Sequence, residues 1–208
     1  MKVEIIDHTQ DLELKIAEAA GICYDSSVSN PKQLLKRLKS NGHLATFRFA
    51  TVTIQVSEFS RTCSMQMLRH AFLDFLQRSQ RYCNEFDFEY VVPPSMINCK
   101  EKIEINVDEH QSFWFSAEDL FHKAMQEDQE YYEAFLKLKI PKEDSRYVLS
   151  NACHTKMNII GNVHAWYDFL YGKAGRLQNA AQWEIRDVAI EIEKQLSEIA
   201  PNIFGNNK

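Results

Sequence analysis

The chain has 208 residues, of which 45% are hydrophobic and 25% charged, and its formal net charge is −5 at pH 7. This length and composition can bury one sizeable core, so we expect a single domain spanning residues 1–208. The acidic balance argues against a general nucleic-acid binder, although it permits a local basic pocket. No apolar run approaches a membrane-spanning length, and the opening residues do not resemble a signal peptide. We therefore expect a cytoplasmic protein that has neither a membrane nor a nucleic acid as partner.

Five cysteines are spread along the chain without a C-x-x-C pair. Their odd number and wide spacing indicate reduced thiols in an intracellular protein. Four histidines, which we expect to be structural or surface residues, lack the spacing of metal ligands: His110, His122, His154 and His164. The sequence therefore predicts no metal site.

Hydrophobic periodicity and turn residues predict the elements of the first half of the chain. In order, they are a strand over Lys2–Ile6, a helix over Asp11–Cys23, a helix from Pro31 that stops at Asn41-Gly42, a turn over His43–Phe47 and a strand over Val52–Val56. Either Thr9 or Asp11 is expected to cap the first helix.

The second half mixes further strands and helices without a regular βαβ alternation. We expect a strand over Phe86–Tyr90, an irregular connection over Ser95–His110, helices over Ser116–Leu138 and Pro141–Leu149, a strand over Thr155–Ile160, and helices over Asn162–Tyr171 and Ala180–Ile199. The Ser116 helix carries an approximate capping box. The pattern predicts an α+β fold, in which helices flank an antiparallel or mixed sheet.

The stretch Phe59–Tyr82 concentrates positive charge in an otherwise acidic chain. Its first part has apolar residues at helical spacing up to Leu68, and a polar loop is expected to follow. It carries four arginines: Arg61, Arg69, Arg78 and Arg81. Because arginine presents forked donors, the stretch is suited to a phosphate or a pyrimidine edge. An ordinary solvated helix face is the alternative interpretation.

Four segments in this order resemble the flavin-dependent thymidylate synthases. SRTCSMQMLRHAFLDFLQRSQRY resembles the signature RHRxxSxxExSxRY and the SRxxxxQ that precedes it. NGHLATFRF resembles the histidine-bearing turn of the family, and RYVL resembles its ARxVLP segment. Asn162 together with RLQNAAQWEI resembles its closing N…LR…AQWEI pattern. The likeness covers most of the chain between His43 and Ile185.

This resemblance implies a flavin-dependent thymidylate synthase-like fold and a homotetramer with active sites between subunits. Each site is expected to bind FAD, dUMP and a folate. The implied reaction transfers one carbon from methylenetetrahydrofolate to C5 of dUMP, with NADPH as reductant, and gives dTMP. It needs no cysteine nucleophile, which suits cysteines that have no evident His-Asp partner.

The resemblance also assigns roles to individual residues. Arg176, which is expected to polarise the uracil ring, and His43, expected near the flavin ring, take the catalytic positions. The positions implied for dUMP are Gln66, Arg69, Ser79, Gln80, Arg81, Arg146 and Arg176. The positions implied for FAD are Arg69, His70, Ala71, Gln77 and Asn162.

Several residues depart from the family pattern, mostly on the flavin and folate side. Ala71 replaces the second arginine of RHR, Asp74 a serine, Gln77 a glutamate and Arg48 a glutamate. One hypothesis is that Arg48 replaces the charge lost at Ala71. Two alternatives to methylation stay open, namely hydroxymethylation of dUMP and a non-catalytic nucleotide-binding paralogue. Flavin content and product mass distinguish the three functions.

Overall fold

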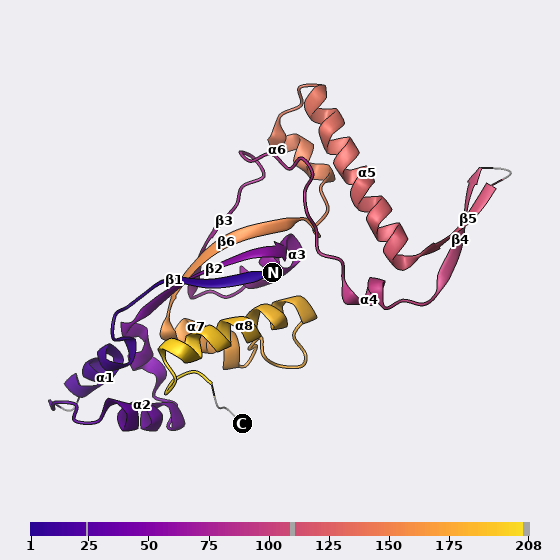
Figure 1. The fold of residues 1–208 in the computed structure, drawn as a ribbon. Helices are drawn as coiled ribbons and strands as arrows, with labels where there is room; N and C mark the ends of the chain where they lie inside the picture. The colour runs from indigo at the N-terminus through magenta and orange to yellow at the C-terminus, as the bar shows by residue number, and fades with distance from the viewer. Residues whose placement is uncertain (24, 109–110, 206–208) are drawn as a thin grey trace. The chain divides into compact units, whose positions relative to one another are not determined.

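The computed structural model describes residues 1–23, 25–108 and 111–205. Its contacts group the chain into two compact units. The sheet unit comprises Met1–Ser57, Cys63–Gln77 and Lys156–Lys208, and the α5 unit comprises Glu58–Thr62 and Arg78–Thr155. Figure 1 labels the elements of both units. The prediction of a single domain over residues 1–208 stays a prediction.

The sheet unit is built on a four-stranded sheet with the order β1-β2-β6-β3. Its elements are β1 (Lys2–His8), α1 (Leu12–Ile22), α2 (Pro31–Ser40), the 3-10 helix η1 (Leu44–Phe49), most of β2 (Thr51–Ser60), most of α3 (Arg61–Met67), β3 (Leu73–Gln77), most of β6 (His154–Asn162), α7 (Val163–Tyr171) and α8 (Trp183–Ile199). The outer strands pair antiparallel with their neighbours, β1 with β2 and β3 with β6. This confirms the predicted α+β class.

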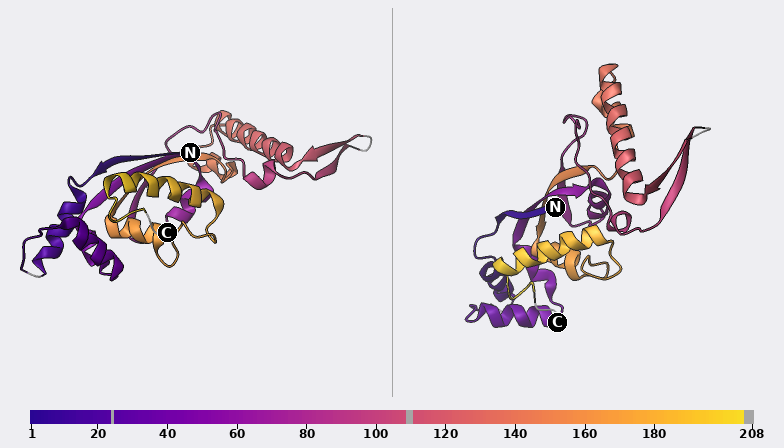
Figure 2. Two further views of the ribbon diagram at one scale, coloured as in Figure 1. Left: turned by 60° about the horizontal axis from the view of Figure 1, so that its bottom comes forward. Right: turned by 45° about the vertical axis from the view of Figure 1, so that its right-hand side comes forward.

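The core of the sheet unit lies between one face of the sheet and the helices α7 and α8. Both views of Figure 2 place these two helices on the same side of the sheet. Alternate residues of β2, such as Val52 and Ile54, are buried, as period-two patterning requires. Trp166 of α7 is fully buried, and its indole N–H donates to the Val52 carbonyl at 3.0 Å. Trp166 thus packs α7 against the sheet.

The α5 unit contains a long helix and a two-stranded ribbon. Its elements are α4 (Pro94–Ile97), β4 (Lys102–Asp108), β5 (Gln111–Ser116), α5 (Ala117–Lys137), α6 (Lys142–Ser145) and the 3-10 helix η2 (Arg146–Val148). The predicted capping box is present, since the Ser116 hydroxyl accepts from the Asp119 N–H and the Asp119 carboxylate accepts from the Ser116 N–H. A small core gathers Phe88, Met125 and Cys153.

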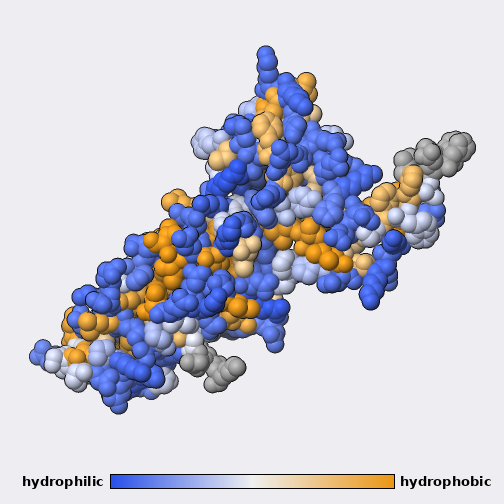
Figure 3. Space-filling model, viewed as in Figure 1, coloured by the Kyte–Doolittle hydropathy of each residue, from blue (hydrophilic) through white to orange (hydrophobic). Residues whose placement is uncertain are grey.

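The β4–β5 ribbon has one apolar face. Ile103 pairs with Phe115 and Ile105 with Phe113, so these four side chains share a side. Ile103 and Phe113 are 56% and 51% exposed. Figure 3 shows apolar residues on this ribbon, while hydrophilic residues cover most of the face in view.

Three predictions about secondary structure were wrong. The residues after Leu68 include the strand β3 where a loop was expected, and β4 occupies part of the expected irregular connection, of which residues 109 and 110 lie outside the described residues. Phe86–Tyr90 forms only an isolated bridge between Tyr90 and Cys153. Short apolar runs such as Leu73–Gln77 fit a strand or a helix equally well, and only their pairing partner decides.

Helix starts were predicted more accurately than their capping bonds. Asp11 is the N-cap of α1, but it adopts a left-handed conformation with φ 49° and its side chain makes no capping hydrogen bond. Asn30 caps α2 by accepting from the Gln33 N–H at 3.0 Å.

Among the described residues, no helix combines the length and the apolar character that crossing a membrane requires.

Candidate active site

The predicted site residues fall in both units. The sheet unit holds His43, Gln66, Arg69, His70, Ala71, Gln77, Asn162 and Arg176, and the α5 unit holds Ser79, Gln80, Arg81 and Arg146. Within the sheet unit, the structure joins Arg176, His70 and Gln66. Within the α5 unit, it joins Arg81 and Arg146 through a common neighbour.

Arg176 lies in the turn between α7 and α8, where its backbone N–H donates to the Phe169 carbonyl at 2.8 Å. Its Nε donates to Nε2 of His70 at 2.8 Å, and its Nη2 donates to the backbone carbonyl of Gln66 at 3.4 Å. Both acceptors are uncharged groups. Among the described residues, no carboxylate forms a hydrogen bond or ion pair with Arg176. The guanidinium is thus held in place while its charge stays available.

His70 follows α3, and its ring meets the Phe169 ring edge-on at 4.8 Å between centroids. Burial, and next the charge of Arg176, lowers the pKa of His70 from 6.5 to about 4. The imidazole is therefore neutral near pH 7. Because Nε2 accepts from Arg176, the ring proton lies on Nδ1, which remains a donor.

Cys63 of α3 lies near Arg176, and its thiol is fully buried. Burial raises the pKa of this thiol, and the charge of Glu184 adds to the effect. The thiol therefore stays protonated and cannot serve as a thiolate nucleophile at neutral pH. This agrees with a site chemistry that does not use cysteine.

The remaining residues of the signature have different surroundings. Arg69 and Ala71 are exposed. The Gln77 amide donates to the Ser64 hydroxyl of α3 at 2.9 Å, so this side chain ties β3 to α3. The Gln66 amide donates to Gln182, whose side chain caps α8. Gln182, the glutamine of the segment AQWEI, is thus a neighbour of the site to which the sequence assigned no role.

Asn162 is the N-cap of α7, and its side-chain oxygen accepts from the Ala165 N–H at 2.9 Å. It lines a cavity of about 180 Å³ together with Arg48, Phe72, His164, Ala165 and Asp168. Arg48 Nε donates to Nδ1 of His164 at 3.1 Å, and Nε2 of His164 lies 3.5 Å from the Asp168 carboxylate. His164 had been expected to be a structural or surface residue, and the structure shows that it orients Arg48.

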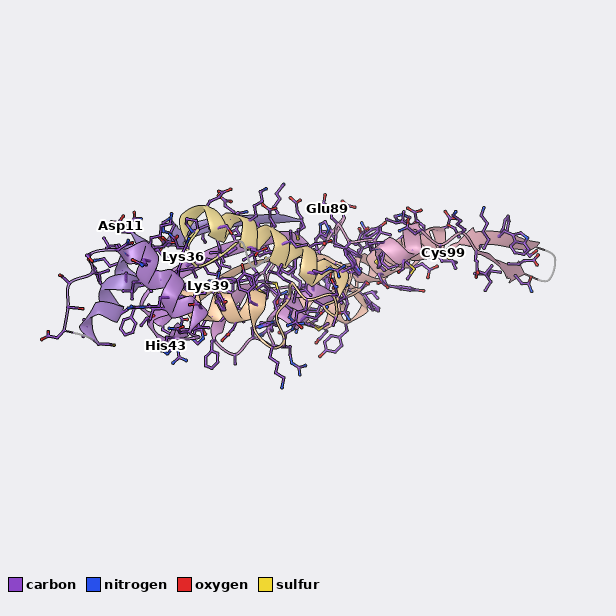
Figure 4. The ribbon with its side chains drawn as sticks, turned by 90° about the horizontal axis from the view of Figure 1, so that it is seen from below. Asp11, Lys36, Lys39, His43, Glu89 and Cys99 are labelled. Carbon is purple, nitrogen blue, oxygen red and sulfur yellow. The ribbon has the colours of Figure 1, made fainter. Side chains whose placement is uncertain are left out.

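His43 begins η1 at the end of α2 and is exposed. Figure 4 labels it at the same end of the sheet unit as Lys36 and Lys39 of α2. Its backbone N–H donates to the Leu38 carbonyl at 2.8 Å. Within the described part of the chain, no hydrogen bond or ion pair joins His43 to Arg176 or His70. Its catalytic role stays a prediction.

In the α5 unit, Arg81 and Arg146 converge on Glu143 of α6. One carboxylate oxygen of Glu143 accepts from Arg81 Nε at 3.0 Å and from Nη2 at 2.8 Å. Arg146 Nε donates to the backbone carbonyl of Glu143 at 3.1 Å. The Arg81 and Glu143 side chains are 51% and 50% exposed. Glu143 had not been recognised from the sequence, although it lies three residues before Arg146.

Two further arginines stand close to this pair. Arg78 forms an ion pair with the buried Glu85 and also donates to the Asn84 carbonyl at 2.8 Å. Burial lowers the pKa of the partly buried Arg61, and the charges of Arg146 and Arg78 lower it further. The charge of Glu85 opposes this lowering. Four arginines and two carboxylates, Glu85 and Glu143, are thus found in this part of the α5 unit, a net positive charge that favours an anionic ligand.

Gln80 is the buried member of this loop, with 6% exposure. Its amide nitrogen Nε2 is buried and, among the residues that the structure describes, has no hydrogen-bond partner. Next to it, the Ser79 hydroxyl accepts from the Arg81 backbone N–H at 3.2 Å. The loop therefore presents a fixed hydroxyl, a guanidinium and an unpartnered amide in three successive residues.

Residues 4–202 match the model of the family described as "Thymidylate synthase complementing protein". The chain belongs to this family. The resemblance inferred from the four sequence motifs is thereby confirmed.

Curated relatives cover nearly the whole chain. One from Geobacter sulfurreducens is 32% identical over 98% of this chain and 85% of its own length. Others from Clostridium tetani and Mycobacterium marinum are 30% and 33% identical, over 98% and 92% of this chain and 85% and 78% of their own lengths. Each of these relatives is named a flavin-dependent thymidylate synthase.

Proposed function

We propose that the chain is a flavin-dependent thymidylate synthase, which transfers a one-carbon unit from methylenetetrahydrofolate to C5 of dUMP with NADPH as reductant. Membership of the family supports the reaction class. The observation that carries the proposal is the pairing of Arg176 with the neutral acceptor His70. This pairing fixes a cation without neutralising it.

Arg176 has the chemistry needed to activate uracil. A guanidinium beside a carbonyl oxygen of the ring stabilises the negative charge that develops there, and it does so without giving up a proton. His70 and the Gln66 carbonyl hold the guanidinium before the substrate arrives. Little reorganisation is then needed during the reaction.

Arg81, Arg146 and Ser79 are suited to the phosphate of dUMP. Two guanidinium groups meet at Glu143, next to a loop with an ordered hydroxyl. Forked donors of this kind bind phosphate oxygens in charge-assisted hydrogen bonds. A phosphate would compete with the exposed Glu143 carboxylate for Arg81.

The residues near Asn162 are suited to contacting one part of a flavin. Their cavity combines the 73% exposed ring of Phe72 with the Asn162 amide and the Arg48 guanidinium, which suit a planar ring and a phosphate. His70 offers its Nδ1 proton as a further donor. When bound, the flavin supplies hydride chemistry, and neighbouring donors and charges of the protein tune it.

The direct test is to incubate the purified chain with dUMP, FAD, methylenetetrahydrofolate and NADPH and to determine the product by mass spectrometry. We expect dTMP, and each single omission should abolish it. Visible absorbance should show oxidised-flavin bands that shift when dUMP is added. A hydroxymethylated product would show that the chain hydroxymethylates dUMP and does not methylate it. If the protein bound no flavin and formed no product, the non-catalytic nucleotide-binding paralogue would be the better description.

The homotetramer is also part of this proposal, as is a cytoplasmic location. The apolar face of the β4–β5 ribbon supports self-association, because a two-stranded ribbon is only marginally stable alone. Covering Ile103 and Phe113 with another copy would stabilise it. Light scattering should give four times the chain mass, and a monomer at micromolar concentration would contradict the assembly.

A further inference from the structure

The ion pair between Arg78 and Glu85 lies at the two ends of the loop that carries Ser79 and Arg81. The Glu85 side chain is only 4% exposed, and Arg78 Nη1 donates to its carboxylate. Acidic side chains are almost never this buried unless a partner balances their charge. The hydrogen bond to Glu85 in turn raises the pKa of Arg78. Arg78 occupies a variable position of the family signature and Glu85 lies beyond its end, so the resemblance assigns a role to neither residue.

Arg78 uses two nitrogens of its guanidinium to join the ends of this loop. While Nη1 binds Glu85, Nη2 donates to the Asn84 carbonyl at 2.8 Å. The Cys83 N–H donates to the Ser79 carbonyl at 3.0 Å, which adds a backbone contact across the loop. Arg78, Asn84 and Glu85 thus form a clip that closes the loop. Because its ends are fixed, the loop has fewer conformations available.

The clip is anchored to the interior of the α5 unit. The Glu85 N–H donates to the Tyr132 hydroxyl of α5 at 3.4 Å, and the Tyr132 side chain is fully buried. Arg61 Nη1 donates to the Arg78 carbonyl at 3.5 Å. Burial lowers the pKa of Arg61, and the charge of Glu85 opposes this effect. Glu85 therefore connects the loop to a buried helix residue and to a second arginine.

We propose that Glu85 is a positioning residue, which acts through Arg78 to hold the loop in the conformation that presents Ser79 and Arg81 to the dUMP phosphate. This inference rests on the proposed function and adds to it a residue that does not itself touch the nucleotide. A buried ion pair often adds little net stability compared with an apolar pair, so stability is a weak reason for this one. A loop that is ordered before binding, in contrast, lowers the entropic cost of binding and raises affinity.

An apolar replacement of the ion pair separates positioning from stability. The double variant Arg78→Met/Glu85→Leu removes both charges together, so neither is left without its partner, and its unfolding temperature should stay within about 3 °C of the wild-type value. Its dUMP dissociation constant, measured by calorimetry on the FAD-bound protein, should nonetheless rise about tenfold, because the loop must then be ordered on binding. Binding of deoxyuridine, which lacks the phosphate, should not change. At saturating dUMP, the turnover number should stay within about twofold of wild type.

A milder variant and a matched control accompany the double variant. Glu85→Gln keeps the shape of the side chain and an oxygen that accepts from Arg78, so it should weaken dUMP only about threefold. Glu127→Gln removes the carboxylate of an exposed ion pair with Lys123 on α5 and should leave dUMP affinity unchanged. Hydrogen exchange at the Cys83 N–H reports the order of the loop directly. It should be faster in the double variant and unchanged in Glu127→Gln.

The results that would overturn the inference differ from those that would overturn the proposed function. Unchanged dUMP affinity or unchanged exchange at Cys83 in the double variant would show that the clip does not position the loop. An equal loss of deoxyuridine binding would show that the clip does not act through the phosphate. If the double variant does not fold, Glu85→Gln carries the test, and wild-type dUMP affinity in that variant would reject the role of Glu85. If the wild type itself binds no dUMP, the proposed function is wrong, and the inference falls with it.

Discussion

The two arginine clusters of this chain hold their cations in opposite ways. Arg176 is held by neutral acceptors, His70 and a backbone carbonyl, in a partly buried setting. Arg81 is held by the Glu143 carboxylate in an exposed one. The first arrangement keeps its charge free for a reacting group, while the second neutralises its charge with an anion that a phosphate can replace. This difference matches the roles proposed for them, in which Arg176 stabilises charge on a reacting group and Arg81 binds a phosphate.

Replacing the catalytic cation should have the largest effect. We expect Arg176→Ala to lower dTMP formation by about 10²- to 10³-fold, as loss of a preorganised charge does in other enzymes. Far-UV circular dichroism should be unchanged. Arg176→Lys should rescue little, because an ammonium lacks the fork that spans His70 and Gln66. Wild-type kinetics in both variants would remove Arg176 from the site.

Replacing the binding cation should act on affinity and therefore separate the two clusters. Arg81→Ala should weaken dUMP by about 10- to 100-fold and abolish turnover at ordinary dUMP concentrations, because a charge-assisted contact to phosphate is lost. Deoxyuridine, which lacks the phosphate, should bind both proteins equally. An equal loss for deoxyuridine would assign Arg81 to the base.

Arg48 tests whether a third cation serves the flavin. Arg48→Ala should weaken FAD about fivefold, measured by fluorescence titration, because one exposed charge in the cavity of about 180 Å³ is removed. His164→Phe should give a smaller loss, since it only releases the orientation of Arg48. Undiminished FAD affinity in Arg48→Ala would reject the idea that Arg48 replaces the charge missing at Ala71.

Glu143→Gln removes the carboxylate that is proposed to compete with a phosphate for Arg81. Exposed ion pairs contribute little, so dUMP affinity should rise only about two- to fivefold. The same gain should be seen with inorganic phosphate. Weaker dUMP binding would show that Glu143 positions Arg81 for the nucleotide and does not compete with it.

The neutral partner of Arg176 makes stability depend on pH. The pKa of His70 is about 4 in the folded chain against an ordinary 6.5, so the unfolded chain binds more protons between these values. Its contribution is complete above about pH 6.5 and is lost as the pH falls towards 4. His70→Gln keeps an acceptor but does not titrate, so urea unfolding of the variant should lose stability less steeply over this interval. Parallel pH profiles would contradict the depressed pKa.

The sequence predicted elements best where local rules decide them. The Ser116 capping box and the period-two burial of β2 depend on neighbouring residues, and both were predicted. β3 pairs with β6, a strand from a distant part of the chain, so its short apolar run was misread. β4 was missed although its partner β5 is the next strand along the chain. Hydrophobic periodicity describes a segment by itself, so it does not show which distant strand that segment pairs with.

The residues of the candidate site show the same contrast between what local sequence reveals and what only the folded chain reveals. Motif likeness identified Arg176, His70 and Gln66, and the structure joins them. It could not identify Glu143 or His164, because each acts through a side-chain contact with an arginine distant in the sequence. Gln80 was assigned from its place in the motif, but its unpartnered amide follows from burial, which no motif records.

The buried, protonated thiol of Cys63 has a pharmacological consequence. Electrophilic drugs that inactivate an enzyme by alkylating a catalytic thiolate would find none beside Arg176, and the thiol itself is shielded from them. Such reagents would first modify the exposed Cys23 and Cys99 instead. If the proposed function holds, an inhibitor of this site would have to bind its arginines, as an anionic mimic of the nucleotide does.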